Sequence, residues 1–168
     1  MAKYCVIRTD LMSGTKQPAD LLSVRIYDGE DNMIDAENGL IVKVGPLEEG
    51  EREVHKATLA AAGDKLDECA ILAGVEMMYE DYKRSLDDYI NVAGKAVRAY
   101  IPRNRNIFSV TKEGFVGGTV PEVGGKVGIG ANGKIDTAAD DLGECIAIEQ
   151  AGMFTFYVIR IDKNAANG

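Results

Sequence analysis

DKLDEC at positions 64–69 and DDLGEC at positions 140–145 repeat almost the same six letters, with four identical positions. An apolar run follows each copy at once, AILAGV after Cys69 and IAI after Cys145. A short apolar run bounded by turn residues is typical of a buried strand. We therefore expect Leu66 and Leu142 to anchor two similar turns, and Cys69 and Cys145 to enter two buried strands.

Each copy is preceded by a glycine-containing turn and a valine-rich segment, ENGLIVKVG at 37–45 and VGGKVGIG at 123–130. A second similarity links VIRTD at 6–10 with VIRID at 158–162, so we expect the two termini to lie close together. Strands about ten residues apart with frequent turns are typical of sandwiches and barrels. The predicted fold is mainly β with a minor helical segment, as two small β-barrel or sandwich-like units. Internal duplication would explain the repeats, and independent strands with similar patterns are the alternative.

The chain divides into three predicted parts: an N-terminal β-rich unit at residues 1–79, a helical connecting segment at 80–94 and a C-terminal β-rich unit at 95–168. The helix is predicted over residues 80–92 because apolar and aromatic side chains recur there at helical spacing: Tyr79, Tyr82, Leu86, Tyr89, Ile90 and Ala93. Gly94 follows, and glycine readily ends a helix. The tyrosines fit a stripe that faces the core, with a dedicated binding surface as the alternative.

The composition argues against several classes of function. The 168 residues fit one ordinary domain or two small ones, and 46% hydrophobic residues suffice for a packed core. A formal net charge of −8 argues against general binding to nucleic acid or to anionic membranes. We expect no export signal and no membrane span. The three cysteines are widely spaced and odd in number, which predicts buried free thiols in a protein made in a reducing cytoplasm.

Local patterns for cofactors and nucleophiles are weak. GIGANG at 128–133 satisfies G-x-G-x-x-G, but the residues after it lack the apolar helical face of a dinucleotide site, so we expect a glycine-rich β-turn. His55 is the single histidine, and no His or Cys pair has the close spacing of a zinc or iron–sulfur site. A nucleophilic pair of Cys69 or Cys145 with His55 would have to be assembled by folding. No catalytic, cofactor-binding or metal-binding residue is predicted, and no cofactor.

The acidic residues leave one enzymatic alternative. A pair such as Asp64 with Glu68, or Asp140 with Glu144, could serve a carboxylate-dependent hydrolase. The chain has 27 acidic residues, so clusters of carboxylates are also expected as solvated turns. A non-enzymatic protein is the first interpretation.

A basic segment interrupts the acidic chain. Residues 89–112 contain no Asp or Glu but include five basic residues: Lys95, Arg98, Arg103, Arg105 and Lys112. The centre, IPRNRN at 101–106, favours an exposed turn, and its two guanidinium groups suit bidentate contact with carboxylates. Arg98, Arg103 and Arg105 are therefore predicted to contact a partner. Pairing with acidic turns of the same chain is the alternative.

The order of these segments resembles a known family. VIRTD, SVRIYDGE, ENGLIVKVG, GEREVHKAT and AAGDKL are followed by the tyrosine-rich segment, AGKAVRAY, IFSVTKEGF and FYVIRID. This progression is similar to the capsid decoration, or cement, proteins of tailed bacteriophages, and it covers nearly the whole chain. The resemblance includes no catalytic or ligand motif, so no family binding residue is carried onto this sequence.

The resemblance implies a non-enzymatic virion protein on the outer capsid surface, made in the host cytoplasm. Its partner would be the major capsid protein, which it would bind in the assembled shell and stabilise. Self-association as a homo-oligomer is compatible with this role, whereas nucleic acid and membranes are not expected partners. A head-to-tail connector or tail component is the alternative within the virion, and the carboxylate-dependent hydrolase is the alternative outside it.

Overall fold

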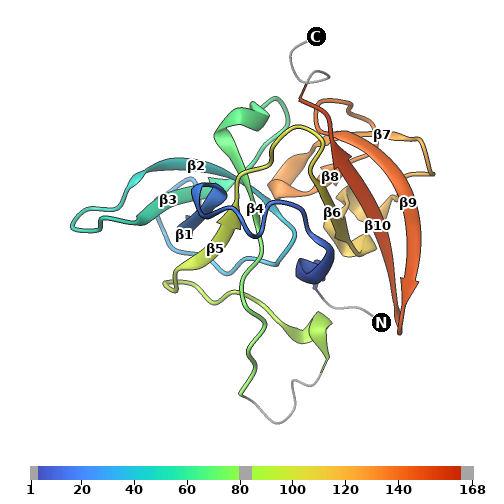
Figure 1. The fold of residues 1–168 in the computed structure, drawn as a ribbon. Coiled ribbons are helices and arrows are strands. Elements are labelled where there is room, and N and C mark those ends of the chain that lie inside the picture. Colours follow the sequence, from blue (N-terminus) through green and yellow to red (C-terminus); the bar gives the residue numbers. More distant parts are fainter. Residues whose placement is uncertain (1–3, 80–84, 164–168) are drawn as a thin grey trace.

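The computed structural model describes residues 4–79 and 85–163, which form a β-rich body (Figure 1). The strands are β1 (Leu21–Tyr27), β2 (Ile41–Leu47), β3 (Val54–Leu59), β4 (Cys69–Leu72), β5 (Val97–Tyr100), β6 (Ile107–Val110), β7 (Lys126–Ile129), β8 (Ile135–Asp136), β9 (Gly143–Ala151) and β10 (Phe154–Ile161). The helical elements of this part are short 3-10 turns: η1 (Thr9–Leu11), η2 (Pro18–Asp20), η3 (Leu66–Glu68), η4 (Leu86–Asp88), η5 (Lys112–Gly114), η6 (Val116–Gly118) and η7 (Ala131–Gly133). Within the described residues, no helix has the length and apolar character to cross a bilayer.

The first five strands form a closed barrel. Their order is β1-β3-β2-β4-β5, and β5 pairs back onto β1. β1 and β3 are parallel, while the other neighbouring pairs are antiparallel. Because successive side chains of a strand point to opposite faces, alternate residues such as Val24 and Ile26 of β1 fill the barrel interior.

The other five strands form a sheet in the order β6-β10-β9-β7-β8. The N-terminal segment extends this sheet, because Ile7 pairs with Val110 on the edge of β6 that β10 leaves open. The two VIR segments at 6–8 and 158–160 therefore lie on either side of β6, and the amide of Arg8 donates to the carbonyl of Ser109. This confirms the prediction that the two terminal segments lie close together.

The barrel and the sheet share a wall made of β2, β4 and β5. On β4, Ala70 and Leu72 point into the barrel, whereas Cys69 and Ile71 point into a second core between barrel and sheet. Phe108, Ile129, Leu142 and Ile159 of the C-terminal part belong to this second core, which lies between the barrel on the left and the sheet on the right of Figure 1. β4 is therefore buried on both faces, which explains its uninterrupted apolar sequence CAIL.

The predicted mainly-β fold of two small β units is confirmed, but the predicted helix is wrong where it can be followed. Residues 80–84 lie outside the described part. Ser85 then caps a single 3-10 turn, and Asn91 forms an extended bridge with Ala36. An isolated short helix is marginal in water, and Tyr79, at one end of the predicted apolar stripe, is 83% exposed. The stripe therefore has no core to pack against at this point.

The predicted division of the chain also differs from the strand pairing. β5 falls within the predicted C-terminal unit at 95–168, yet it pairs with β1 and β4 of the barrel. The segment between β4 and β5 is thus an excursion from one barrel strand to the next, and it does not connect the two units. The chain passes from barrel to sheet between Tyr100 and Ile107 through a largely exposed loop, and Tyr100 and Phe108 on either side of this loop belong to the core between barrel and sheet.

The two hexapeptides occupy comparable positions. Leu66 and Leu142 are buried, as are Cys69 and Cys145, and all four belong to the core between barrel and sheet. Each hexapeptide leads to a strand held between two antiparallel neighbours, β2 and β5 for β4, and β7 and β10 for β9. Duplication remains a hypothesis, because the first set closes a barrel with a parallel pair and the second lies in an open sheet.

GIGANG is a β-turn that fastens the sheet to the barrel. Gly128 and Ile129 end β7, and the η7 turn follows with Asn132 and Gly133 both at positive φ. The amide of Gly133 donates to the carbonyl of Ala60 at 2.7 Å. A Cβ at this glycine would overlap the carbonyl oxygen of Ile41 in β2, so the last glycine of the pattern is required for packing.

Gly133→Ala is expected to lower the free energy of unfolding by roughly 2–5 kcal/mol, combining about 1–2 kcal/mol for a left-handed non-glycine residue with about 1–3 kcal/mol for overpacking. Denaturant unfolding measures the loss. Gly63→Ala is the matched control, because Gly63 has φ +90° and no atom within 4 Å of the added Cβ. Equal losses in the two variants would contradict a special contact between η7 and the barrel.

Candidate interaction surface

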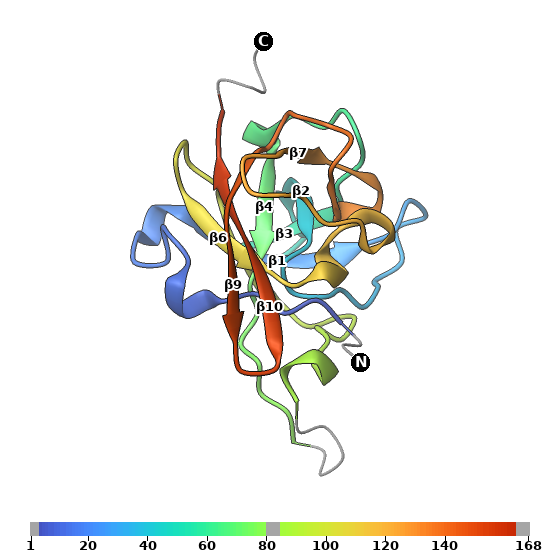
Figure 2. The same cartoon turned by 90° about the vertical axis from the view of Figure 1, so that its right-hand side faces the viewer.

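An arm of exposed apolar side chains leaves the barrel between β4 and β5. We define it as residues 74–79 and 85–93, which extend away from the body in both views (Figures 1 and 2). The first branch has no regular secondary structure, and Val75, Met77 and Tyr79 are exposed at 51%, 59% and 83% while the residues between them are half-buried. Leu86 and Val92 of the second branch are also exposed. Clustered exposed apolar side chains are a feature of interaction surfaces.

Two buried asparagines hold the base of the arm. The side chain of Asn38 accepts a hydrogen bond from the Gly74 amide at 2.8 Å and donates to the Gly74 carbonyl at 3.0 Å. The Asn91 amide group donates to Asn38 Oδ1 and to the carbonyl of Ala36, both at 2.9 Å. A Cβ at Gly74 would overlap the Asn91 side chain. Both branches are therefore fixed to residues 36–38, and the direction of the arm is set by the folded body.

The ionisable groups at the arm are partly desolvated. Burial raises the pKa of Glu76, whose carboxylate accepts a hydrogen bond from Asn38. Burial, and secondarily the Glu76 carboxylate, raise the pKa of Tyr89. The Tyr89 hydroxyl donates to Asn91 Oδ1 at 3.0 Å. These polar groups therefore lie at the base of the arm, beside Asn38 and Asn91, which we call the clamp. The exposed side chains of the first branch are mainly apolar.

The acid-free stretch does not form one basic patch. Lys95 precedes β5 and Arg98 lies on it, next to the arm, because the amide of Ala73 donates to the Arg98 carbonyl. Arg103 and Arg105 follow β5 at its other end, where the Arg105 amide donates to the carbonyl of Ile161. The five basic residues are thus distributed along the molecule. Arg98, Arg103 and Arg105 therefore do not form one continuous patch, and contacts of these residues with a partner would be separate ones.

Arg103 has a partner in its own chain. Its Nε lies 2.8 and 2.7 Å from the two carboxylate oxygens of Asp20, whose side chain is 3% exposed. Arg103 therefore follows the alternative interpretation, in which an arginine of this segment pairs with an acidic turn of its own chain. Arg98 and Arg105 are exposed, and no ion pair joins either side chain to another described residue.

Three of the four carboxylates of the hydrolase alternative are engaged in structural contacts. Asp64 binds Lys43 at 2.9 Å and caps the amide of Ala61, and Glu68 lies 3.5 Å from the same lysine. Glu144 is paired with Arg160 and Lys126, while Asp140 is exposed. These pairs tie the acidic hexapeptides to neighbouring strands.

A cleft of about 260 Å³ does bring the two hexapeptides together, with Asp64, Asp67 and Asp141 in its lining. The backbone hydrogen bond from Ala61 lowers the pKa of Asp64, and the hydrogen bond from Lys163 lowers that of Asp67. A general acid and base need pKa values moved apart, whereas these two move in the same direction. Across the described residues, no group of three His, Cys, Asp or Glu side chains has the geometry to hold a metal ion.

The cysteines are buried free thiols, as predicted. Desolvation raises the pKa of Cys5 and of Cys69 to about 12, and it also raises that of Cys145. Each therefore stays protonated at neutral pH, whereas nucleophilic catalysis uses the thiolate. Nδ1 of His55 is hydrogen-bonded to the carbonyl oxygen of Gly45 at 3.1 Å on the half-buried surface of β3.

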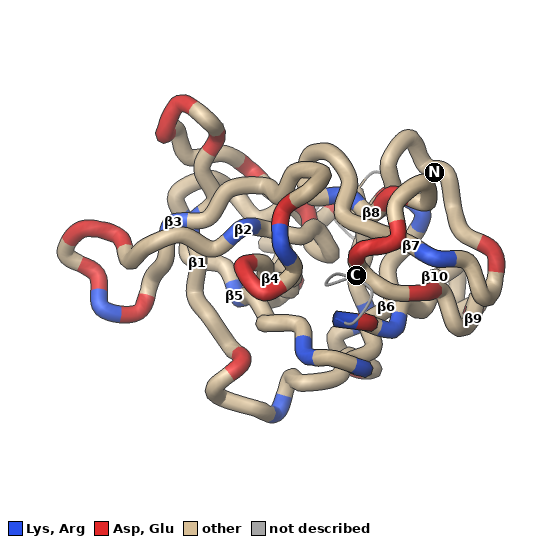
Figure 3. Tube along the Cα trace, turned by 90° about the horizontal axis from the view of Figure 1, so that it is seen from above, with Lys and Arg blue, Asp and Glu red and all other residues tan. Residues whose placement is uncertain are grey.

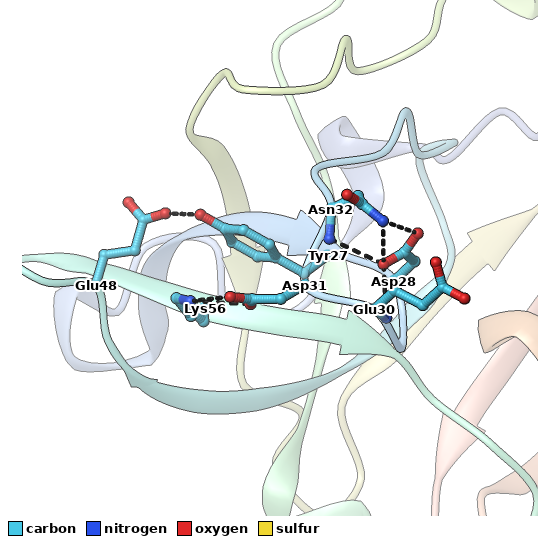
Figure 4. Close-up of polar contacts among 7 residues, drawn as sticks. All are labelled: Tyr27, Asp28, Glu30, Asp31, Asn32, Glu48 and Lys56. Carbon is cyan, nitrogen blue, oxygen red and sulfur yellow. Dashed lines mark hydrogen bonds and ion pairs between the residues drawn. The ribbon is translucent and has the colours of Figure 1, made fainter.

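The acidic hairpin between β2 and β3 is held to the barrel by an ion network. Figure 3 shows the hairpin extending from the body with acidic residues in its turn. Glu48 is buried and accepts hydrogen bonds from the Tyr27 hydroxyl and from Arg25. Lys56 lies 4.8 Å from the centre of the Tyr27 ring and pairs with Asp31 at 2.9 Å, as Figure 4 shows. These carboxylates have a structural role, and part of the negative charge is neutralised within the chain.

Comparisons with protein-family models, with curated proteins and with solved structures give no match to this chain. Function is therefore inferred from the surface of the molecule. The arm is the most distinctive feature of this surface. The sequence did not indicate it, because the spacing of the tyrosines predicted a helix in the same segment. The run EMMYEDY at 76–82 was the available signal, because it places large apolar side chains between charged residues.

Glu48→Gln is expected to lower the free energy of unfolding by about 1.5–3 kcal/mol at pH 7, the typical contribution of a hydrogen bond to a charged group. The Tyr27 hydrogen bond and then Arg25 lower the pKa of Glu48. Its stabilisation is therefore present above the ordinary pKa of glutamate and is lost as the pH falls through the folded value.

Denaturant unfolding between pH 7 and pH 3 measures this effect, and the difference between wild type and variant should shrink on the acidic side. Glu51→Gln is the control, because Glu51 contacts the same arginine at 3.3 Å but is exposed. A constant difference at every pH would contradict the role of an ionised Glu48.

Proposed function

We propose that this protein is a non-enzymatic structural protein of a tailed-phage virion that binds the outside of the assembled capsid and stabilises it. The arm carries this proposal. It places Val75, Met77 and Tyr79 in solvent on a projection whose base is fixed by Asn38 and Asn91. A preorganised projection loses little conformational entropy when it docks, so apolar burial on a partner contributes more fully to affinity.

The body behind the arm suits a mechanical role. Barrel and sheet share one core through β4, so the two layers cannot separate without exposing Cys69, Ile71 and their neighbours. Force applied at the arm is transmitted to the wall of β4 and β5, from which both branches emerge. A rigid body with a projecting contact can link neighbouring parts of a larger assembly.

The resemblance of the segment order to capsid decoration proteins supports a phage shell as the partner. A shell repeats the same binding site many times, and contacts that are weak singly become durable when several act together. The proposed partner is the major capsid protein in its assembled form. Exposed ion pairs contribute only about 0–1 kcal/mol each, so burial of the arm supplies most of the affinity and charge guides the approach.

Replacing Met77 and Tyr79 by serine is expected to weaken binding to assembled shells by more than about tenfold, since full burial of one such side chain stabilises by about 1.5–3 kcal/mol. Co-sedimentation with undecorated expanded shells measures affinity and copy number. The matched control is Val120→Ser with Val123→Ser, because Val123 is 61% exposed in a loop far along the chain from the arm.

Saturation at many copies per shell with a selective loss in the arm variant supports decoration. Saturation at a small fixed number would indicate a closed ring at one vertex, as for a connector. Failure of the wild-type protein to bind any expanded shell would reject the proposed function.

Arg98→Glu combined with Arg105→Glu is expected to slow association with shells, because charge complementarity acts mainly on the rate of encounter. Both residues are exposed, so the fold should be retained. Arg103 is left unchanged, since its replacement would leave the buried Asp20 without its partner.

Association rates at low and high salt provide the measurement. Raising the salt concentration should slow the wild type more than the double variant. Lys16→Glu with Lys65→Glu gives the same charge change elsewhere on the surface, and both lysines are exposed. Equal slowing by the two double variants would show a general charge effect and reject the assignment of Arg98 and Arg105.

A further inference from the structure

A small cleft lies at the base of the arm, lined by both branches and by the start of β5. Its volume is about 150 Å³. It is lined by Met77, Met78 and Tyr79 of the first branch, by residues 89–92 of the second, which include Tyr89 and Asn91, and by residues 95–97, which include Lys95. Sites for drug-sized ligands occupy roughly 300–1,000 Å³. This cleft is therefore of a size for one side chain of a partner.

The apolar part of the lining is adaptable. Met77 and Met78 have long unbranched side chains, which fit irregular shapes and make favourable contacts with aromatic rings. Tyr79 and Tyr89 are opposite members of the two branches that line the cleft, and Tyr89 is held by its hydrogen bond to Asn91. One wall is thus fixed by the clamp, and the other can adjust to an apolar side chain of a partner.

Lys95 gives the cleft a positive charge. Its side chain is exposed and forms no ion pair with any residue that the structure describes. Glu76, the nearby acid of the first branch, is absent from the cleft lining, although its carboxylate is close enough to raise the pKa of Tyr89. Arg98, the second residue of β5, is exposed as well. Of the described residues that line the cleft, Lys95 is the one with a formal charge, on a protein whose formal net charge is −8.

We propose that the cleft binds a short protein segment in which an apolar side chain stands beside a carboxylate. The apolar side chain enters between the methionines and tyrosines, and the ammonium group of Lys95 pairs with the carboxylate. This inference rests on the proposal that the arm is the docking element, and it adds the chemistry of the segment that the arm recognises. Lys95 is then the residue that determines specificity for an acidic partner.

Three peptides test this recognition: acetyl-Leu-Glu-Leu amide, its Gln counterpart and its Lys counterpart. Titration of the ¹⁵N-labelled protein, followed by amide chemical shifts, measures both the site and the affinity. The Glu peptide should shift the resonances of residues 77–79 and 89–97. It should bind more tightly than the Gln peptide, by up to about fivefold for a solvent-accessible ion pair, and the Lys peptide should bind most weakly.

Lys95→Glu should reverse this order, so that the Lys peptide binds more tightly than the Glu peptide. Lys112→Glu is the control with the same change in net charge, and it should keep the wild-type order because Lys112 lies on η5. Peptides that cause no shifts in the cleft, or an order that Lys95→Glu leaves unchanged, would overturn the inference.

The peptide and shell experiments separate the two proposals. Selective binding of the Glu peptide without binding to shells supports the cleft assignment and rejects the phage shell as partner. Binding to shells without any preference among the peptides supports the proposed function and rejects the role of Lys95.

Discussion

Burial of β4 on both faces is the constraint on which the rest of the structure depends. The four consecutive residues Cys69–Leu72 are all buried. Their side chains point alternately into the barrel interior and into the core between barrel and sheet. A strand in this position can be made stable only when both layers are present. Barrel and sheet are therefore parts of one cooperative body, although their strands form separate hydrogen-bonded sets.

The arm depends on the same wall. It leaves after β4 and returns before β5, two strands that are hydrogen-bonded neighbours through the pairs Ile71 with Tyr100 and Leu72 with Ala99. The two ends of the excursion are consequently held a strand's width apart, and Asn38 and Asn91 then fix both branches. The backbone that carries the exposed apolar side chains therefore leaves the body in a set direction, which reduces the conformational entropy lost when a partner binds.

The sequence was informative wherever local pattern and burial agree. The apolar run after Cys69 and the turn leucines Leu66 and Leu142 indicated buried strands, and the two VIR segments indicated neighbouring termini. The tyrosine spacing was misleading, because helical periodicity stabilises a helix only when a core lies beside it. Local spacing predicts that Arg103 contacts another molecule, because Asp20, with which it pairs in its own chain, lies 83 positions away and cannot be inferred from neighbouring residues.

The repeated hexapeptide has one further physical meaning. In the first copy Glu68 lies 3.5 Å from Lys43 on β2, the strand paired with β4, and in the second Glu144 lies 3.4 Å from Lys126 on β7, the strand paired with β9. In both copies the leucine is buried before the strand and the cysteine is buried within it. The same residues thus have the same structural roles where the chain passes from a solvated turn into a core strand. The acid forms an ion pair at the surface, the leucine covers the edge of the core, and the cysteine packs as a small apolar residue between the two layers. Duplication and convergence both satisfy this requirement, so the repeat is explained by the packing that it makes possible.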